Sequence, residues 1–175
     1  VATIDVYAIG DFHGRLETSG ESAGIAVLGS FLADARRTNP ASLVVSTGDN
    51  VGGSPFLSAA SGDQITIDLL DEVGLDASAV GANELRLASA ESADIVTDAD
   101  FPFLAANLYC RTTGNRPYPA YSVQSVGGVT IGFVSVISPE VMVAPDWGNC
   151  GLEIRDPVSE ANAVAAQLSD GDGAN

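Results

Sequence analysis

Short apolar runs alternate with amphipathic stretches through the first 110 residues of the chain. Strand-like segments have either alternating or continuous apolar side chains, and the segments between them have apolar side chains at helical spacing. This order of strands and helices predicts βαβ units, in which the strands run parallel in one sheet. We predict strands over residues 3–9, 42–47, 77–81 and 103–107, and helices over residues 20–37 and 63–73.

The pattern changes after residue 120. Residues 121–126 and 129–137 flank Gly127-Gly128, a two-residue turn typical of a β-hairpin. A last helix is predicted from Asp156-Pro157 to residue 168, and residues 169–175 have the composition of a polar tail. A parallel sheet that is followed only by a hairpin and a helix has an uncovered edge or face. We therefore expect a further segment or another chain to pack there.

The composition is that of an acidic globular domain. The chain has 175 residues, 46% of them hydrophobic, which argues against intrinsic disorder. Its formal net charge is −16, and its seven basic residues are all Arg. So acidic a surface repels nucleic acid, although a phosphate-bearing small molecule could bind where metal cations reverse the local field. No apolar run reaches the roughly 18 residues that a membrane span needs.

Three polar clusters follow predicted strands, at residues 10–14 (GDFHG), 48–54 (GDNVGGS) and 81–84 (GANE). Each alone is common in turns, but the carboxyl ends of parallel strands meet at one crevice, so we expect the three to converge. Asp11 and His13 are two positions apart and can face the same ion, and an imidazole with carboxylates suits Zn, Mn or Fe. Asp49 on the neighbouring strand could bridge two ions.

The segments DFHGRLE, GDNVGGSPF and FPFLAANLY resemble, in this order, the catalytic domain of the 5'-nucleotidase and UDP-sugar hydrolase family of calcineurin-like metallophosphatases. GVTIGFVSVISPE and DPVSEANAVAAQL are similar to later parts of the same pattern, so the resemblance covers nearly the whole chain. It implies an α/β fold of the layered α/β/β/α type and hydrolysis of phosphate esters of nucleotides or sugar nucleotides. It also implies two divalent metals (Zn, Mn, Fe or Mg), with Asp11 and His13 on the first and Asp49 bridging both.

The chain departs from the family's pattern in two places. Where the family has Gly-Asn-His-Glu, this chain has Gly81-Ala82-Asn83-Glu84, so Ala82 replaces a metal ligand and Asn83 occupies the position of the catalytic, phosphate-contacting His. Asn83 cannot deliver a proton, and moving it into the ligand position would re-aim its side chain. The chain also has a single His, so the family's later His ligands are absent from it. We expect one bound metal or none, and little activity from this chain alone.

These departures leave two interpretations. In the first, residues 1–175 are the N-terminal part of one metallophosphatase domain, without the family's nucleotide-binding C-terminal domain, and the rest of a parent chain or a second copy completes it. In the second, the domain is degenerate and serves as a binding or surface-interaction module. The family and the first residue, Val1, favour a secreted, periplasmic or cell-surface protein. In such an oxidising compartment Cys110 and Cys150 would form a disulfide rather than remain two buried thiols.

Overall fold

A four-stranded parallel sheet forms the centre of the protein in a computed structural model that describes residues 2–20, 22–88, 98–141 and 150–170. Its strands lie side by side in the order of the sequence, and β1 pairs with β2 from Asp5 opposite Ser42 to Ile9 opposite Ser46. All the carboxyl ends therefore lie at one edge. The strands are β1 (Asp5–Ile9), β2 (Ser42–Ser46), β3 (Ala77–Ala79) and β4 (Phe103–Leu104).

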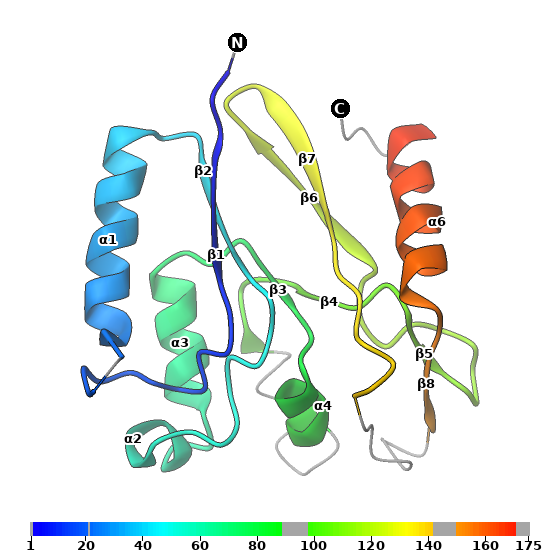
Figure 1. The fold of residues 1–175 in the computed structure, drawn as a ribbon, viewed down its shortest axis with the longest axis horizontal. Coiled ribbons are helices and arrows are strands. Elements are labelled where there is room, and N and C mark those ends of the chain that lie inside the picture. The colour runs from blue at the N-terminus through cyan, green and yellow to red at the C-terminus, as the bar shows by residue number, and fades with distance from the viewer. Residues whose placement is uncertain (1, 21, 89–97, 142–149, 171–175) are drawn as a thin grey trace.

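Helices α1 (Gly24–Thr38) and α3 (Gln64–Glu72) cover one face of this sheet (Figure 1). Their buried apolar side chains join those of the sheet in the main core, which includes Leu32, Val44 and Ile67. Two shorter helices, α2 (Phe56–Ala59) and α4 (Ala82–Ala88), lie beyond the carboxyl ends of β2 and β3. They flank the edge at which the polar clusters were expected.

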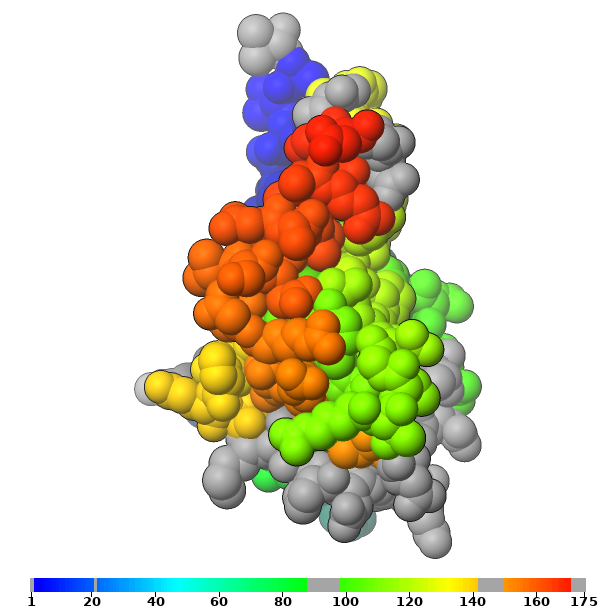
Figure 2. Space-filling model, turned by 90° about the vertical axis from the view of Figure 1, so that its right-hand side faces the viewer, coloured from blue at the N-terminus to red at the C-terminus, as the bar shows by residue number. Residues whose placement is uncertain are grey.

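The other face of the sheet is covered by the hairpin of β6 (Tyr121–Val126) and β7 (Val129–Val134), and α6 (Pro157–Asp170) lies outside the hairpin (Figure 1). A second, small core between α6 and the hairpin contains Val164 and Leu168. Figure 2 shows α6 as the outer surface on this side of the molecule. The layers therefore follow the predicted α/β/β/α order.

A two-stranded sheet of β5 (Leu108–Cys110) and β8 (Leu152–Ile154) lies below α6. Next to it, Cys110 and Cys150 are joined as a disulfide, with their Cα atoms 5.2 Å apart. The Tyr109 hydroxyl donates to Glu160 on α6 at 2.7 Å, and Arg116 donates to the same carboxylate at 2.8 Å. These contacts attach the small sheet to the helix.

The parallel sheet, its two main helices and the hairpin with its Gly127-Gly128 turn agree with the sequence patterns. The predicted polar tail was wrong in part, because Ser169 and Asp170 belong to α6, and the rest of it lies outside the described residues. The sequence patterns also missed four short elements, because three to seven residues are too few to show a period; these are α2, α4, β5 and β8. Among the described residues, no helix is long and apolar enough to cross a membrane.

Candidate metal centre

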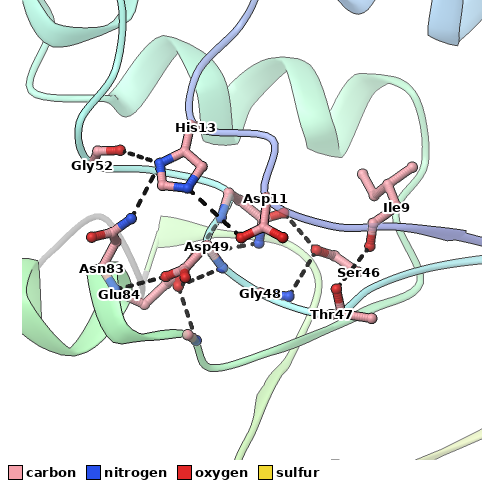
Figure 3. Close-up of polar contacts among 12 residues, drawn as sticks. Ile9, Asp11, His13, Ser46, Thr47, Gly48, Asp49, Gly52, Asn83 and Glu84 are labelled. Atoms are coloured by element: carbon pink, nitrogen blue, oxygen red, sulfur yellow. Dashed lines mark hydrogen bonds and ion pairs between the residues drawn. The ribbon is translucent and has the colours of Figure 1, made fainter. Parts of the chain in front are cut away.

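Asp11, His13 and Asp49 converge at the carboxyl edge of the parallel sheet (Figure 3). Asp11 and His13 lie on the loop after β1, and Asp49 lies on the loop after the neighbouring strand β2. One potential ligand atom from each residue lies within 4.8 Å of the other two, and the imidazole Nε2 is 3.8 Å from Asp11 Oδ1. The Asp11 side chain is 80% exposed and that of His13 28%, so the cluster is open to solvent on one side.

The backbone at these three residues is left-handed. Their φ angles are 50°, 49° and 52°, and among the described residues Asp63 is the only other non-glycine residue with a positive φ. Such a conformation costs about 1–3 kcal/mol per residue and persists only when the surrounding structure enforces it. Here the two loops bond to each other, because the N–H groups of Asp11 and His13 donate to the carbonyl groups of Gly48 and Asp49 at 3.1 and 3.0 Å.

The hydrogen bond of His13 identifies its tautomer. Nδ1 lies 2.7 Å from the carbonyl oxygen of Gly52, which can only accept, and 3.2 Å from the Asn83 amide nitrogen, which can only donate. We assign the proton to Nδ1 because the contact with the carbonyl is the shorter of the two. The lone pair is then on Nε2, which faces Asp11 (Figure 3). Metal-binding imidazoles are commonly held in this way, with the second ring nitrogen bonded to a carbonyl.

Glu84 connects the polar cluster at residues 81–84 to the one at residues 48–54, and it is not itself a candidate metal ligand. Its carboxylate is fully buried and accepts the backbone N–H groups of Asp49, Asn50 and Gly81 at 3.0, 2.8 and 2.9 Å. Burial raises the pKa of Glu84, and the hydrogen bond from Asn50 opposes that rise. This role was not predicted from the sequence, in which Glu84 is only one member of the third polar cluster.

Asn83 lies beside the cluster, whereas Ala82 offers no donor atom to it. The Asn83 N–H donates to Asp49 Oδ1 at 2.8 Å, and its side-chain nitrogen lies 3.2 Å from His13 Nδ1. Its side-chain oxygen accepts a close hydrogen bond from the exposed Arg86. Asn83 thus touches a candidate ligand at the position predicted for the phosphate contact, and that role stays a prediction.

The donor set fits a divalent cation. Two carboxylates and a neutral imidazole are hard and borderline ligands that suit Zn, Mn or Fe, and their summed charge of about −2 balances such an ion. Three side chains of this kind could hold one metal, with the remaining coordination positions filled by water or substrate. Any further imidazole ligand must come from outside these residues, since His13 is the only His in the sequence.

The relatives found by comparison with known proteins include nucleotidases and an endonuclease. Endonuclease YhcR of Bacillus subtilis is 25% identical over 189 residues, which is 93% of this chain and 15% of that protein. A 5'-nucleotidase of Vibrio cholerae is 26% identical over 165 residues, 90% of this chain and 30% of that protein. The solved calcineurin-like phosphoesterase YfkN from Bacillus subtilis superposes with a TM-score of 0.80 at 21% identity, covering 98% of this chain and 59% of that one. No protein-family model matches the chain.

The chain belongs to the 5'-nucleotidase family of calcineurin-like metallophosphatases. A protein of Acinetobacter calcoaceticus is 30% identical to this chain, over 73% of this chain and 80% of that protein. The resemblance predicted from the three motifs is therefore confirmed, as is the fold. Metallophosphatases of this family use divalent metals, and Asp11, His13 and Asp49 are the described residues that could hold one. The chain spans 15% and 30% of the length of the YhcR and Vibrio relatives, respectively.

Proposed function

We propose that this chain is the metal-binding part of a metallophosphatase that hydrolyses phosphate esters of nucleotides, and that the chain alone turns substrate over poorly. The observation that carries the proposal is the convergence of Asp11, His13 and Asp49 within 4.8 Å at the open edge of the sheet. A divalent cation bound there would polarise a phosphoryl oxygen and neutralise charge that develops on it.

The chain's own residues have distinct parts in this proposal. Asp11 and Asp49 supply the negative charge that attracts a cation, and His13 presents Nε2 because Gly52 holds its other nitrogen. Glu84 fixes the backbone of Asp49. The backbone N–H groups of Asp11 and His13, the His13 Nδ1 and the Asp49 Oδ1 are all hydrogen-bonded without a cation, whereas the Asp11 side chain is 80% exposed. The positions of His13 and Asp49 are thus preorganised, as electrostatic catalysis requires.

The expected impairment follows from Ala82 and Asn83. Ala82 has no donor for a second metal, and the Asn83 amide cannot deliver a proton to a leaving group. A positioned general acid is worth roughly 10²–10⁴-fold in rate, so its absence alone predicts slow turnover. The same two residues favour the second candidate function, a degenerate, non-catalytic domain that serves as a binding or surface-interaction module.

The proposed substrate is a nucleotide or sugar nucleotide rather than a nucleic acid. The YhcR relative is named an endonuclease, so nucleic acids have to be weighed against small nucleotides as substrates. The net charge of −16 on this chain opposes a polyanion far more strongly than a mononucleotide, whose few charges can be met by the metal. We therefore expect a monoester to be preferred to a diester.

Export and a completing partner are also part of the proposal. Export is supported by the joined Cys110 and Cys150 and by a relative named as a cell wall protein in Listeria monocytogenes. The partner would be the rest of a parent chain or a second copy. A mainly apolar groove of about 310 Å³ between the ends of β2–β4 and β7 is a surface where such a segment could pack.

The test combines metal binding with turnover in the purified chain. Calorimetric titration with Mn²⁺ should show about one bound ion, and Asp49→Ala should abolish it because one of three ligands is lost. Hydrolysis of AMP, a UDP-sugar and bis(p-nitrophenyl) phosphate should be far below the roughly 10 s⁻¹ of a typical enzyme. The matched control is Asp68→Ala, on the exposed side of α3, which should behave as the unaltered chain.

Two outcomes would contradict the proposal separately. Mn²⁺ binding that survives Asp49→Ala would refute the metal site. Fast turnover that Asp49→Ala abolishes would keep the site and refute the impairment, and preference for the diester would refute the proposed substrate class.

A further inference from the structure

A buried polar cluster of Ser58, Asp63 and Thr66 lies behind the loop that contacts His13. Asp63 is 5% exposed, and Ser58 and Thr66 are fully buried. The cluster lies on and between α2 and α3, and it holds none of the candidate metal ligands. A buried carboxylate is costly unless hydrogen bonds compensate it, so the partners of Asp63 indicate what it does.

Both carboxylate oxygens of Asp63 are used. Oδ2 accepts the backbone N–H of Gly52 at 2.9 Å, and Oδ1 accepts the Ser58 hydroxyl at 2.5 Å. Ser58 Oγ is also 2.5 Å from Thr66 Oγ1, which holds the hydroxyl in place. Gly52 is the same residue whose carbonyl accepts the His13 Nδ1 proton at 2.7 Å. One residue therefore lies between the Asp63 carboxylate and the imidazole.

The same cluster also packs against the chain on the other side of His13. A side chain at Gly14, the next residue, would place its Cβ 2.6 Å from Ser58 Oγ and 2.7 Å from Ser58 Cβ. Gly52 has a φ of +79°, and a Cβ there would lie 2.9 Å from Asn83 Cβ. Both contacts require glycine, so His13 is held between two close approaches of backbone to buried side chains.

The backbone of Asp63 supports a functional reading. With a φ of 71°, it is the one described non-glycine residue outside the candidate ligands that has a left-handed conformation. Strain of this kind concentrates where the surrounding structure has to hold a specific geometry. The strained residue here is Asp63, and its carboxylate accepts the N–H group of Gly52.

We propose that Asp63 is a positioning residue that, through Gly52, keeps His13 in the tautomer with its proton on Nδ1 and its lone pair on Nε2. A higher affinity of the centre for a divalent cation follows, because the ligand nitrogen is available without rearrangement. This consequence rests on the proposed function, whereas the effect on the tautomer does not. A purely structural role, in which Asp63 only stabilises the α2–α3 turn, would alter stability and leave the tautomer unchanged.

The single His of the chain makes a direct measurement feasible. In a ¹⁵N-labelled, metal-free sample at about pH 8.5, where imidazoles are neutral, the nitrogen shifts of one residue report its tautomer. Asp63→Gly removes the carboxylate without strain at this φ, and Asp63→Asn keeps an acceptor oxygen and tolerates the left-handed backbone. Asp68→Gly is the control, since glycine inside a helix costs about 1 kcal/mol at this exposed position of α3 without touching Gly52.

We expect the unaltered chain and Asp63→Asn to show the Nδ1-protonated tautomer, and Asp63→Gly to show a mixture. Calorimetric Mn²⁺ affinity should fall roughly tenfold in Asp63→Gly, at the lower end of the effect of a lost outer hydrogen bond, and stay within about threefold in Asp63→Asn. Asp68→Gly should lower the melting temperature and change neither readout. Ser58→Ala keeps the carboxylate but removes its hydroxyl donor. It should also raise the fraction of the Nε2-protonated tautomer, but by less than Asp63→Gly does.

An unchanged tautomer in both Asp63→Gly and Ser58→Ala would overturn the proposal and leave a structural role. If Asp63→Gly does not fold, Ser58→Ala decides alone. Absence of Mn²⁺ binding by the unaltered chain would contradict the proposed function, and the metal-free tautomer measurement would still decide the role of Asp63.

Discussion

Glu84 illustrates how one buried carboxylate organises a site in which it is not a ligand. Its two oxygens accept N–H groups from both loops that follow β2 and β3, and one of these groups belongs to the candidate ligand Asp49. Glycine is required at Gly81, where a Cβ would lie 2.4 Å from the Asp49 nitrogen. The carboxylate of Glu84 can bond to both loops only because they approach closely, and its hydrogen bonds in turn hold the loops together.

Replacing Glu84 by Gln should destabilise the protein by about 2–4 kcal/mol. The new amide nitrogen would face N–H donors, and each buried donor left without an acceptor costs about 1–3 kcal/mol. Urea unfolding at pH 7 measures the loss, and the exposed Glu72→Gln on α3 is the control. A loss below about 0.5 kcal/mol would show that the hydrogen bonds of Glu84 contribute little.

At the scale of elements, α6 is attached to the small sheet by charged and aromatic contacts rather than by a large core. Tyr109 on β5 donates to Glu160, and the guanidinium of Arg155 lies 3.5 Å from the centre of the Tyr109 ring. The hydrogen bond from Tyr109, together with Arg116, holds the pKa of Glu160 below its usual value. A carboxyl group whose pKa is lower in the folded than in the unfolded state stabilises the fold when it is ionised.

The stabilisation from Glu160 should therefore depend on pH. It is fully present above the ordinary Glu pKa of about 4.5 and is lost as the pH falls through the lower pKa of the folded state. Glu160→Gln should lower the urea midpoint at pH 7 and have a smaller effect at pH 3. Glu153→Gln, in the half-exposed pair with Arg155 at 3.6 Å, should change little at either pH. An equal effect of Glu160→Gln at both pH values would contradict the assignment.

At the scale of the molecule, Cys110 and Cys150 connect the chain across the segment that contains the hairpin. They are 40 residues apart in sequence, and both lie at the sheet of β5 and β8, which carries α6. The disulfide therefore closes a loop that contains the hairpin and reinforces the pairing of β5 with β8. The second small core, between α6 and the hairpin, is the other attachment of that helix.

Loss of this link should cost about 4 kcal/mol in the chain-entropy estimate for a loop of this length. Urea unfolding of the chain with and without reductant measures it, and the double variant Cys110→Ser, Cys150→Ser should match the reduced protein. Addition of reductant to the double variant is the control and should change nothing. Equal midpoints for the oxidised and reduced protein would contradict a stabilising disulfide.

The parallel sheet, its two main helices and the hairpin were predictable from the sequence, because the hydrophobic periods and the Gly127-Gly128 turn are local signals. The sequence also brought Asp11, His13 and Asp49 to one edge, since the carboxyl ends of parallel strands must meet there. Short elements such as α4 escaped it, because a few residues show no period. Which side chains would support the ligands was not predictable either.

Only the tertiary structure showed that Glu84 binds backbone N–H groups, that Asn83 lies against the imidazole, and that Asp63 reaches His13 through Gly52. These contacts join loops 34 to 70 residues apart in the chain for Glu84 and Asn83. The loops that make these contacts contain left-handed backbone angles at His13, Asp49 and Asp63. A pattern of residue types records neither a φ angle nor the approach of two distant loops, so the supporting contacts of the site exist only in the folded chain.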